Sequence, residues 1–138
     1  MDKTLNLLAL ARKAGLAELG EEPVGAITRA LKGCLVLVAR DASDHTWRRA
    51  KSFVAGTDQQ CVRLPYTKEE VGFAIGRQEL AIAAITDAKL ALSLVQALDQ
   101  EEKHKAVIEV LSEKATRLAK RQAEAKAHQR NKRFGKKK

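Results

Sequence analysis

The sequence predicts an α/β protein, a three-layer α/β/α sandwich with a small central mixed sheet, followed by a basic C-terminal helix and tail. Apolar residues at helical spacing alternate with short continuous apolar runs, a pattern typical of helices packed on strands that are buried on both faces. Charge is also divided unevenly, because residues 1–100 carry 13 basic and 12 acidic residues whereas residues 101–138 carry 13 and 5. We therefore expect one domain over residues 1–100 and a basic helical extension over residues 101–138.

The chain begins with a predicted helix. Leu5, Leu8 and Ala9 share one face at helical spacing, and Gly15 stands where a glycine commonly ends a helix. Residues 16–19 then form a candidate short strand.

A second helix is predicted by Val24, Ile27 and Leu31, which repeat at intervals of three and four residues. Pro23 suits its first turn, and Gly33 lies just beyond its end.

Three apolar runs are predicted as buried strands. They cover residues 35–39, 61–64 and 81–85, and Pro65 stops the second. Because helices separate consecutive strands, we expect helices on both faces of one sheet.

Polar caps mark the starts of three further helices. Ser43 or Asp44 is placed to cap the third helix, the capping box at residues 67–70 opens the fourth, and Thr86-Asp87 caps the fifth. The residues expected on their inner faces are Trp47, Ala50, Phe53 and Val54, then Val71, Ala74 and Ile75, and finally Leu90, Leu94 and Leu98.

The extension predicts one more helix, from about Glu101, with a narrow apolar stripe. Beyond Leu118 only alanines interrupt the charge, so packing contributes little, and we expect the helix to fray near His128. The stripe comprises Val107, Leu111, Ala115 and Leu118.

The end of the chain is almost purely basic, since residues 117–138 hold ten basic residues and one acidic residue. A solvated surface usually mixes the two signs. A run of one sign attracts polyanions, because neutralising phosphates releases their condensed counterions.

Other residue types argue against several classes of protein. Cys34 and Cys61 lie in or beside apolar runs and are expected to be reduced, buried thiols. His45, His104 and His128 are far apart, and we expect no metal among them. No nucleophile–base arrangement, signal peptide or membrane-spanning apolar run stands out. We therefore expect a cytoplasmic, non-catalytic protein that needs no cofactor and makes no use of a membrane.

Five motifs occur in a recognisable order. They are residues 11–15 (Ala-Arg-Lys-Ala-Gly), 20–22 (Gly-Glu-Glu), 35–43 (Leu-Val-Leu-Val-Ala-Arg-Asp-Ala-Ser), 67–77 (Thr-Lys-Glu-Glu-Val-Gly-Phe-Ala-Ile-Gly-Arg) and 81–87 (Ala-Ile-Ala-Ala-Ile-Thr-Asp). Together, over residues 4–99, they resemble the ribosomal protein superfamily named for archaeal L-seven-Ae and eukaryotic L-thirty-e, and most closely its bacterial YlxQ-like branch. The resemblance implies an α/β/α RNA-binding protein without catalytic activity, of a type that often recognises kink-turns. The basic extension lies outside it.

The resemblance also implies where RNA would bind. One place is the turn and helix from Gly20 to about Arg29, and the other is the loop of residues 76–81. A helix N-terminus offers free N–H groups to phosphate or base oxygens, and glycine permits a close approach. The residues expected to contact RNA there are Gly20, Glu21, Glu22, Arg29, Arg77 for phosphate and Leu80 against an exposed base.

The turn departs from the kink-turn pattern of the family. Only Gly20 matches, because Glu22, Pro23 and Ala26 stand where the family has Asn, Glu and Lys. These changes argue against high-affinity kink-turn recognition. Glu21 and Glu22 either accept hydrogen bonds from a guanine edge or simply face the positive end of the helix dipole.

Further basic residues are candidates for RNA contact. Lys32 and Arg29 either reach backbone phosphates or serve solubility. Arg40 lies at the C-terminal end of a predicted strand, where α/β sheets often bind ligands. The candidates in the extension are Arg117, Lys120, Arg121, Arg130, Lys132 and Arg133.

The leading hypothesis is therefore a monomeric RNA-binding protein that acts on structured ribosomal RNA in translation or ribosome assembly. Its expected partners are the ribosome or ribosomal proteins. An alternative is the RNA-recruiting module of a larger RNA-modifying or multidomain protein. A third is a protein-interaction or membrane-surface role for the helix after Glu101, although its thin stripe lacks the Trp that favours membrane insertion.

Overall fold

The computed structural model describes residues 2–98 and 103–135, with side chains as far as residue 127. The described part of the chain contains six helices and four strands, which alternate except that the last two elements are both helices. In order they are α1 (Lys3–Lys13), β1 (Ala17–Leu19), α2 (Glu21–Arg29), β2 (Leu35–Val38), α3 (Asp44–Val54), β3 (Gln60–Arg63), α4 (Lys68–Ala74), β4 (Ile82–Ile85), α5 (Ala88–Ala97) and α6 (Lys105–Gly135).

The four strands form one mixed sheet in the order β1-β4-β2-β3. β2 and β3 are parallel, whereas β4 runs antiparallel to both β1 and β2. The two central strands, β2 and β4, are buried along their whole length, as the sequence predicts. β3 is an edge strand and only Val62 within it is buried, because an edge strand has a neighbour on one side only.

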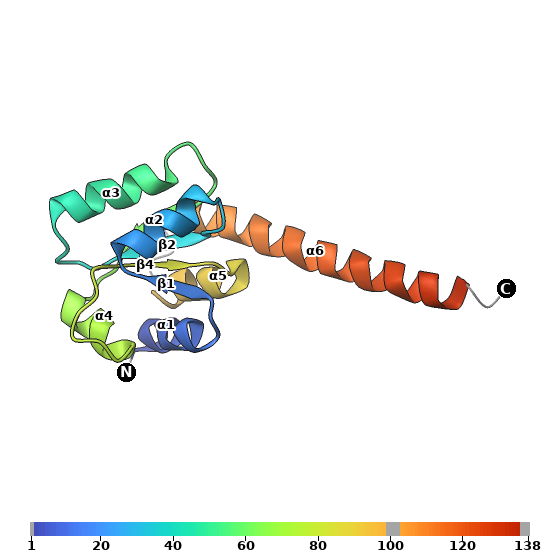
Figure 1. Ribbon diagram of the computed structural model, residues 1–138, viewed down its shortest axis with the longest axis horizontal. Coiled ribbons are helices and arrows are strands. Elements are labelled where there is room, and N and C mark those ends of the chain that lie inside the picture. The colour runs from blue at the N-terminus through green and yellow to red at the C-terminus, as the bar shows by residue number, and fades with distance from the viewer. Residues whose placement is uncertain (1, 99–102, 136–138) are drawn as a thin grey trace.

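Helices cover both faces of the sheet, which confirms the α/β/α architecture. α2 and α3 lie on one face, and α1, α4 and α5 lie on the other (Figure 1). The first part of α6 packs against α5 and β3, and the helix then projects away from the body (Figure 1).

The predicted N-terminal caps are confirmed. Ser43 Oγ accepts the Thr46 N–H at 3.1 Å at the start of α3, and an Asp87 carboxylate oxygen accepts the Leu90 N–H at 2.9 Å at the start of α5. At α4, Thr67 and Glu70 form the full capping box. These contacts satisfy N–H groups that have no partner within their own helix.

Three helices end in the same left-handed turn. At the ends of α1 and α4 the turn residue is a glycine, Gly15 with φ 74° and Gly76 with φ 75°. At the end of α2 it is Leu31, with φ 59°. There the N–H groups of Leu31 and Lys32 donate to the carbonyls of Thr28 and Ile27, both at 3.0 Å, as in the two glycine turns.

The spacing of Leu31 predicts that it lies on the inner face of α2, and this prediction is wrong. The helix ends at Arg29, and the Leu31 side chain is 67% exposed. The left-handed conformation costs a residue with a side chain about 1 kcal/mol relative to glycine.

The hydrophobic core continues into α6, beyond residue 100. Leu111 is 0% exposed and Ala115 is also buried in the same core as Leu94 of α5, whereas Leu118 is 37% exposed. The expected helix start at Glu101 lies outside the described residues. At its other end α6 reaches Gly135 rather than fraying near His128, because residues 119–134 contain no Gly or Pro and are rich in strong helix formers.

Candidate functional site

The candidate site residues fall at two opposite ends of the sheet. At one end, which we call the Gly20 end, the Gly20 N–H donates to the Ile82 carbonyl at 3.0 Å, and the Ala39 N–H donates to the Ala81 carbonyl at 2.9 Å. At the other, the α6 end, the Cys34 N–H donates to the Ile85 carbonyl at 2.8 Å. Four-residue strands separate the two ends by about 10 Å.

The Gly20 end unites the two places that the sequence singles out. Gly20 caps α2 with φ 99°, and its hydrogen bond to Ile82 joins it to the strand that follows the loop of residues 76–81. No side chain caps the first turn of α2. This end of the sheet therefore offers backbone N–H groups beside a glycine, as the sequence predicts.

Acidic side chains surround that turn. The Glu21 carboxylate is ion-paired with the Arg49 guanidinium of α3, which also lies 5.4 Å from the centre of the Phe53 ring. Glu22 is exposed in the same first turn. Two carboxylates at a helix N-terminus interact favourably with the positive end of the helix dipole, but they repel phosphate.

The structure shifts the roles of residues in the neighbouring loop. Leu80 is 5% exposed and packs in the hydrophobic core, so its side chain leaves little surface for a base. Arg77 and Arg40 are both exposed. Arg12 also lies here, and its Nη1 donates to the Ile75 carbonyl at 2.5 Å, which holds the end of α4. The sequence does not predict this role of Arg12, because its partner Ile75 is 63 residues away in the chain.

A hollow of about 900 Å³ beside the loop is lined by four acidic residues and one basic residue, together with polar and apolar side chains. Tyr66 lies in it, and burial together with a hydrogen bond to Asp2 raises the pKa of its hydroxyl to about 12. That hydrogen bond in turn lowers the pKa of Asp2. The remaining lining residues are Leu5, Glu69, Glu70, Phe73, Arg77, Gln78 and Glu79.

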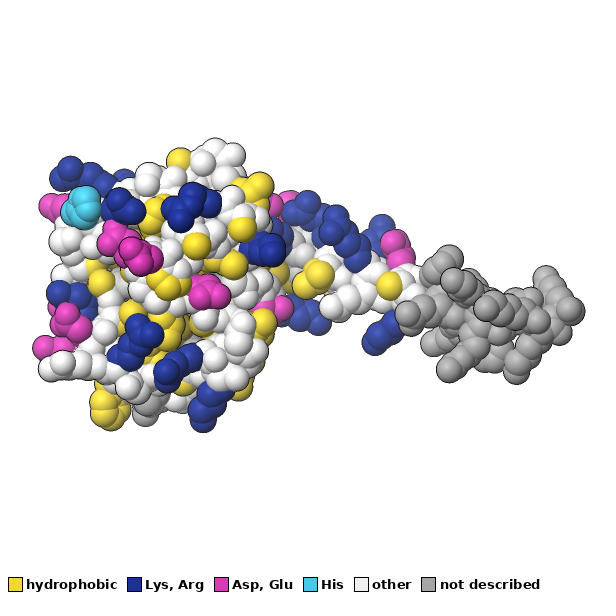
Figure 2. Space-filling model, viewed as in Figure 1, with side chains coloured by type: hydrophobic (Ala, Val, Ile, Leu, Met, Phe, Trp, Pro, Cys, Tyr) yellow, Lys and Arg dark blue, Asp and Glu magenta, His cyan; other side chains and the backbone are white. Residues whose placement is uncertain are grey.

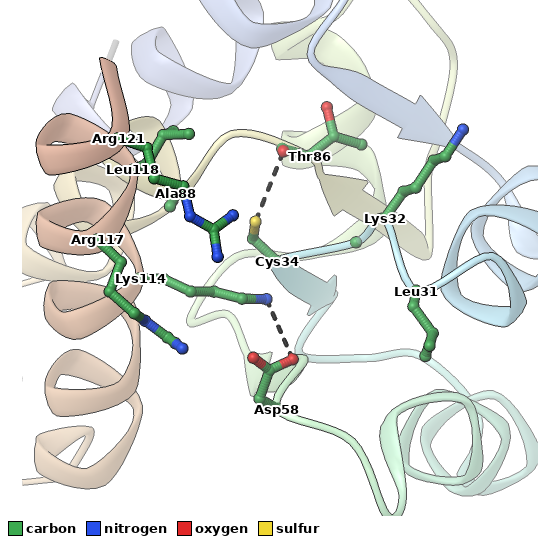
Figure 3. A pocket seen from close by; sticks show the side chains of 11 residues that line it. Leu31, Lys32, Cys34, Asp58, Thr86, Ala88, Lys114, Arg117, Leu118 and Arg121 are labelled. Carbon is green, nitrogen blue, oxygen red and sulfur yellow. Dashed lines mark hydrogen bonds and ion pairs between the residues drawn. The ribbon is translucent and has the colours of Figure 1, made fainter. Parts of the chain in front are cut away.

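The α6 end holds a second cleft, of about 370 Å³, between the turn of residues 31–33 and α6 (Figure 3). We call it the α6 cleft. It is lined by Leu31, Lys32, Gly33, Cys34, Asp58, Thr86, Ala88, Lys114, Arg117, Leu118 and Arg121.

Cations from α6 dominate this cleft. Arg117 and Arg121 extend from α6 toward the body, whereas the Lys32 amine on the opposite rim points away from α6 (Figure 3). Lys114 Nζ lies 3.3 Å from an oxygen of Asp58, the cleft's single carboxylate. The floor includes the Cys34 thiol, which faces the Thr86 carbonyl at 3.5 Å and whose pKa is raised by burial.

The turn opposite α6 is rigidly held by Gln59, which is itself buried. Its Oε1 accepts the Gly33 N–H at 2.9 Å, and its Nε2 donates to the Thr28 carbonyl at 3.1 Å. A side chain at Gly33 would begin 2.9 Å from that Oε1, so a larger residue there would displace the Gln59 amide. Nothing in the sequence distinguishes Gln59 from an ordinary loop residue, and the prediction missed it.

The remaining basic candidates lie along α6 and α2. Lys120 is exposed on α6 and Arg29 on α2. On the face that Figure 2 shows, Lys and Arg gather on α6 where it leaves the body, whereas the body mixes both signs. The side chains of Arg130, Lys132 and Arg133 lie outside the described part.

Metal-ligating clusters and membrane-spanning helices are both absent from the described residues. No group of three or more His, Cys, Asp or Glu side chains is placed to hold a metal among those residues. No helix there is long and apolar enough to cross a membrane.

Among known proteins, this chain is similar to solved structures. No protein-family model and no curated protein matches the sequence. A protein of unknown function from Bacillus halodurans matches with a TM-score of 0.67 and 26% identity, over 72% of this chain and 100% of the other. A 15.5kD RNA binding protein from Giardia lamblia matches with a TM-score of 0.60 and 18% identity, over 75% of this chain and 85% of the other. These likenesses establish that the body shares its fold with both proteins.

Proposed function

We propose that this protein is a non-catalytic, cytoplasmic RNA-binding protein that acts as a monomer on structured RNA, namely ribosomal RNA, in translation or ribosome assembly. The observation that carries the proposal is α6, a 31-residue helix anchored at one end of the sheet and almost purely basic beyond it. The Giardia protein of the same fold, which is described as RNA-binding, supports it.

The free part of α6 suits a long polyanion. The helix rises about 1.5 Å per residue, so the residues after Leu118 span about 25 Å. The side chains of residues 120–127 are exposed, so their charges are accessible to a ligand. Such a basic rod attracts phosphates at long range and irrespective of sequence.

The Gly20 end would then select the RNA site rather than supply most of the affinity. Its backbone N–H groups and glycine turn suit contact with RNA, but Glu21 and Glu22 oppose phosphate. High-affinity kink-turn binding is therefore not part of the proposal.

Salt dependence tests the role of α6. If about six charges of the extension engage single-stranded RNA, the slope of log affinity against log salt is near −4, a loss of roughly two to three decades between 50 and 200 mM salt. A chain that ends at Arg121 loses seven basic residues and one acidic residue. We expect weaker binding and a flatter slope for it.

The cut is placed there for a structural reason. Removal of residues 101–138 would take Leu111 out of the core and confuse unfolding with lost charge. Equal slopes for the full chain and the chain ending at Arg121, measured by fluorescence anisotropy with ribosomal RNA fragments, would contradict the proposed role of α6.

A further inference from the structure

We propose that the α6 cleft is a separate RNA-contact site, which holds one phosphate of a single-stranded segment together with the unstacked nucleotide beside it. This inference rests on the proposed function and deepens it, because it assigns a place and a strand type to the contact. The cleft lies at the opposite end of the sheet from Gly20, so the two sites contact different parts of an RNA.

Charge in the cleft is available to a ligand. Asp58 already engages Lys114, and that pair is one of two ion pairs among the described side chains. Arg117 and Arg121 belong to neither pair, and both reach into the cleft (Figure 3). An anion between them would therefore displace no internal partner.

The residue type favours a nucleotide over a simple ion. A guanidinium binds a phosphate through two parallel hydrogen bonds, and its flat face also stacks on a base. Arg117 and Arg121 lie four residues apart on one helix, and thus on the same side of it. The pair suits a phosphate with a base next to it.

Leu31 supplies the apolar contact on the opposite rim. It adopts the left-handed conformation that a glycine adopts at the ends of α1 and α4, yet it has a large, exposed side chain. Strain of this kind persists where surrounding structure enforces it, and it is frequent at binding sites. Leu118 lies across from it on α6, so the rim offers apolar surface on both sides.

The shape of the cleft favours a single strand. A volume of about 370 Å³ is near the lower limit of ligand sites and suits one nucleotide. A duplex keeps its bases stacked inside, so it would offer phosphates alone to the rim. The turn at Gly33 is fixed by Gln59 before any ligand arrives, which reduces the entropy lost on binding.

Two pairs of substitutions test the cleft in the full chain, with a uridine hexamer and a 12-base-pair RNA duplex as probes. R117Q/R121Q removes the two cleft cations, and K120Q/K126Q removes the same charge from the same helix outside the cleft lining. We expect R117Q/R121Q to weaken hexamer binding at least about tenfold more than the control pair. For the duplex, we expect the two pairs to differ little.

Leu31→Gly separates binding from folding. Glycine relieves the backbone strain, so stability is retained or increased, while loss of the side chain weakens hexamer binding about threefold. Amide NMR spectra add the location, since the hexamer should shift Gly33 and Thr86 in the cleft.

The outcomes are distinguishable. Equal losses in both charge pairs, or shifts confined to Gly20 and Gly76, would overturn the cleft site and leave the proposed function intact. Failure of the full chain to bind either RNA would overturn both.

Discussion

The two ends of the sheet differ in what they offer a ligand. The Gly20 end presents backbone, a glycine turn and the carboxylates of Glu21 and Glu22. The α6 end presents arginine side chains over a rigid turn, with Leu31 at its rim. One scaffold therefore carries a glycine turn with free backbone N–H groups at one end of the sheet and a concentration of arginine side chains at the other.

The α6 end depends on the packing of α6 in the hydrophobic core. α6 lies over β3 and α5 with Leu111 inside, and this packing carries Arg117 and Arg121 to the cleft. The packing of α6 therefore fixes where part of the extension's positive charge lies relative to the sheet. The following changes test how far the two ends differ.

The largest expected effect concerns the anchor of the α6 end. Leu111→Ala should lower the free energy of unfolding by about 2–5 kcal/mol, because Leu111 is fully buried. The Leu118 side chain is already partly in solvent, so Leu118→Ala should lower the free energy of unfolding by less than about 1 kcal/mol. Urea denaturation measures both. Similar small values would show that α6 is not anchored in the core and would remove the basis for the α6 end.

A pH effect of intermediate size should arise at the start of α6. His104 is 6% exposed, its Nε2 finds no partner among the described residues, and burial lowers the pKa of its imidazole. Below about pH 6.5 the unfolded chain takes up a proton that the folded protein resists. Stability from the neutral ring is thus full above pH 6.5 and lost as pH falls through the folded pKa.

Urea denaturation at pH 7.5, 6.5 and 5.5 measures this effect. His104→Gln should remove that part of the pH dependence, which for one proton stays below about 1.4 kcal/mol per pH unit. An unchanged profile in the variant would assign the effect to other groups.

The smallest effect should come from charge at the Gly20 end. Glu22→Lys changes a repulsive group beside the α2 N-terminus into an attractive one, and we expect RNA to bind about threefold more tightly at 100 mM salt. Glu109→Lys, an equal change at an exposed position of α6 outside the cleft lining, is the control. Equal gains would mean that RNA does not approach the Gly20 end closely.

Much of the fold was predictable because its signals are local. The capping residues Ser43, Thr67 and Asp87 and the buried runs of β2 and β4 act over a few neighbouring residues, and the structure confirms them. Leu31 shows where a local signal misleads. Its helical spacing extends the apolar face of α2, but the chain turns at that residue.

Local sequence signals were enough to predict the alternation of helices and strands, the glycine turn at Gly20 and the concentration of positive charge after residue 100. Tertiary structure alone decided that Leu80 is buried, that Gln59 fixes the turn at Gly33, and that Lys32 shares a cleft with Arg121. The physical reason is distance along the chain. Periodicity and capping report on neighbouring residues, whereas a cleft depends on which distant segments the core brings together.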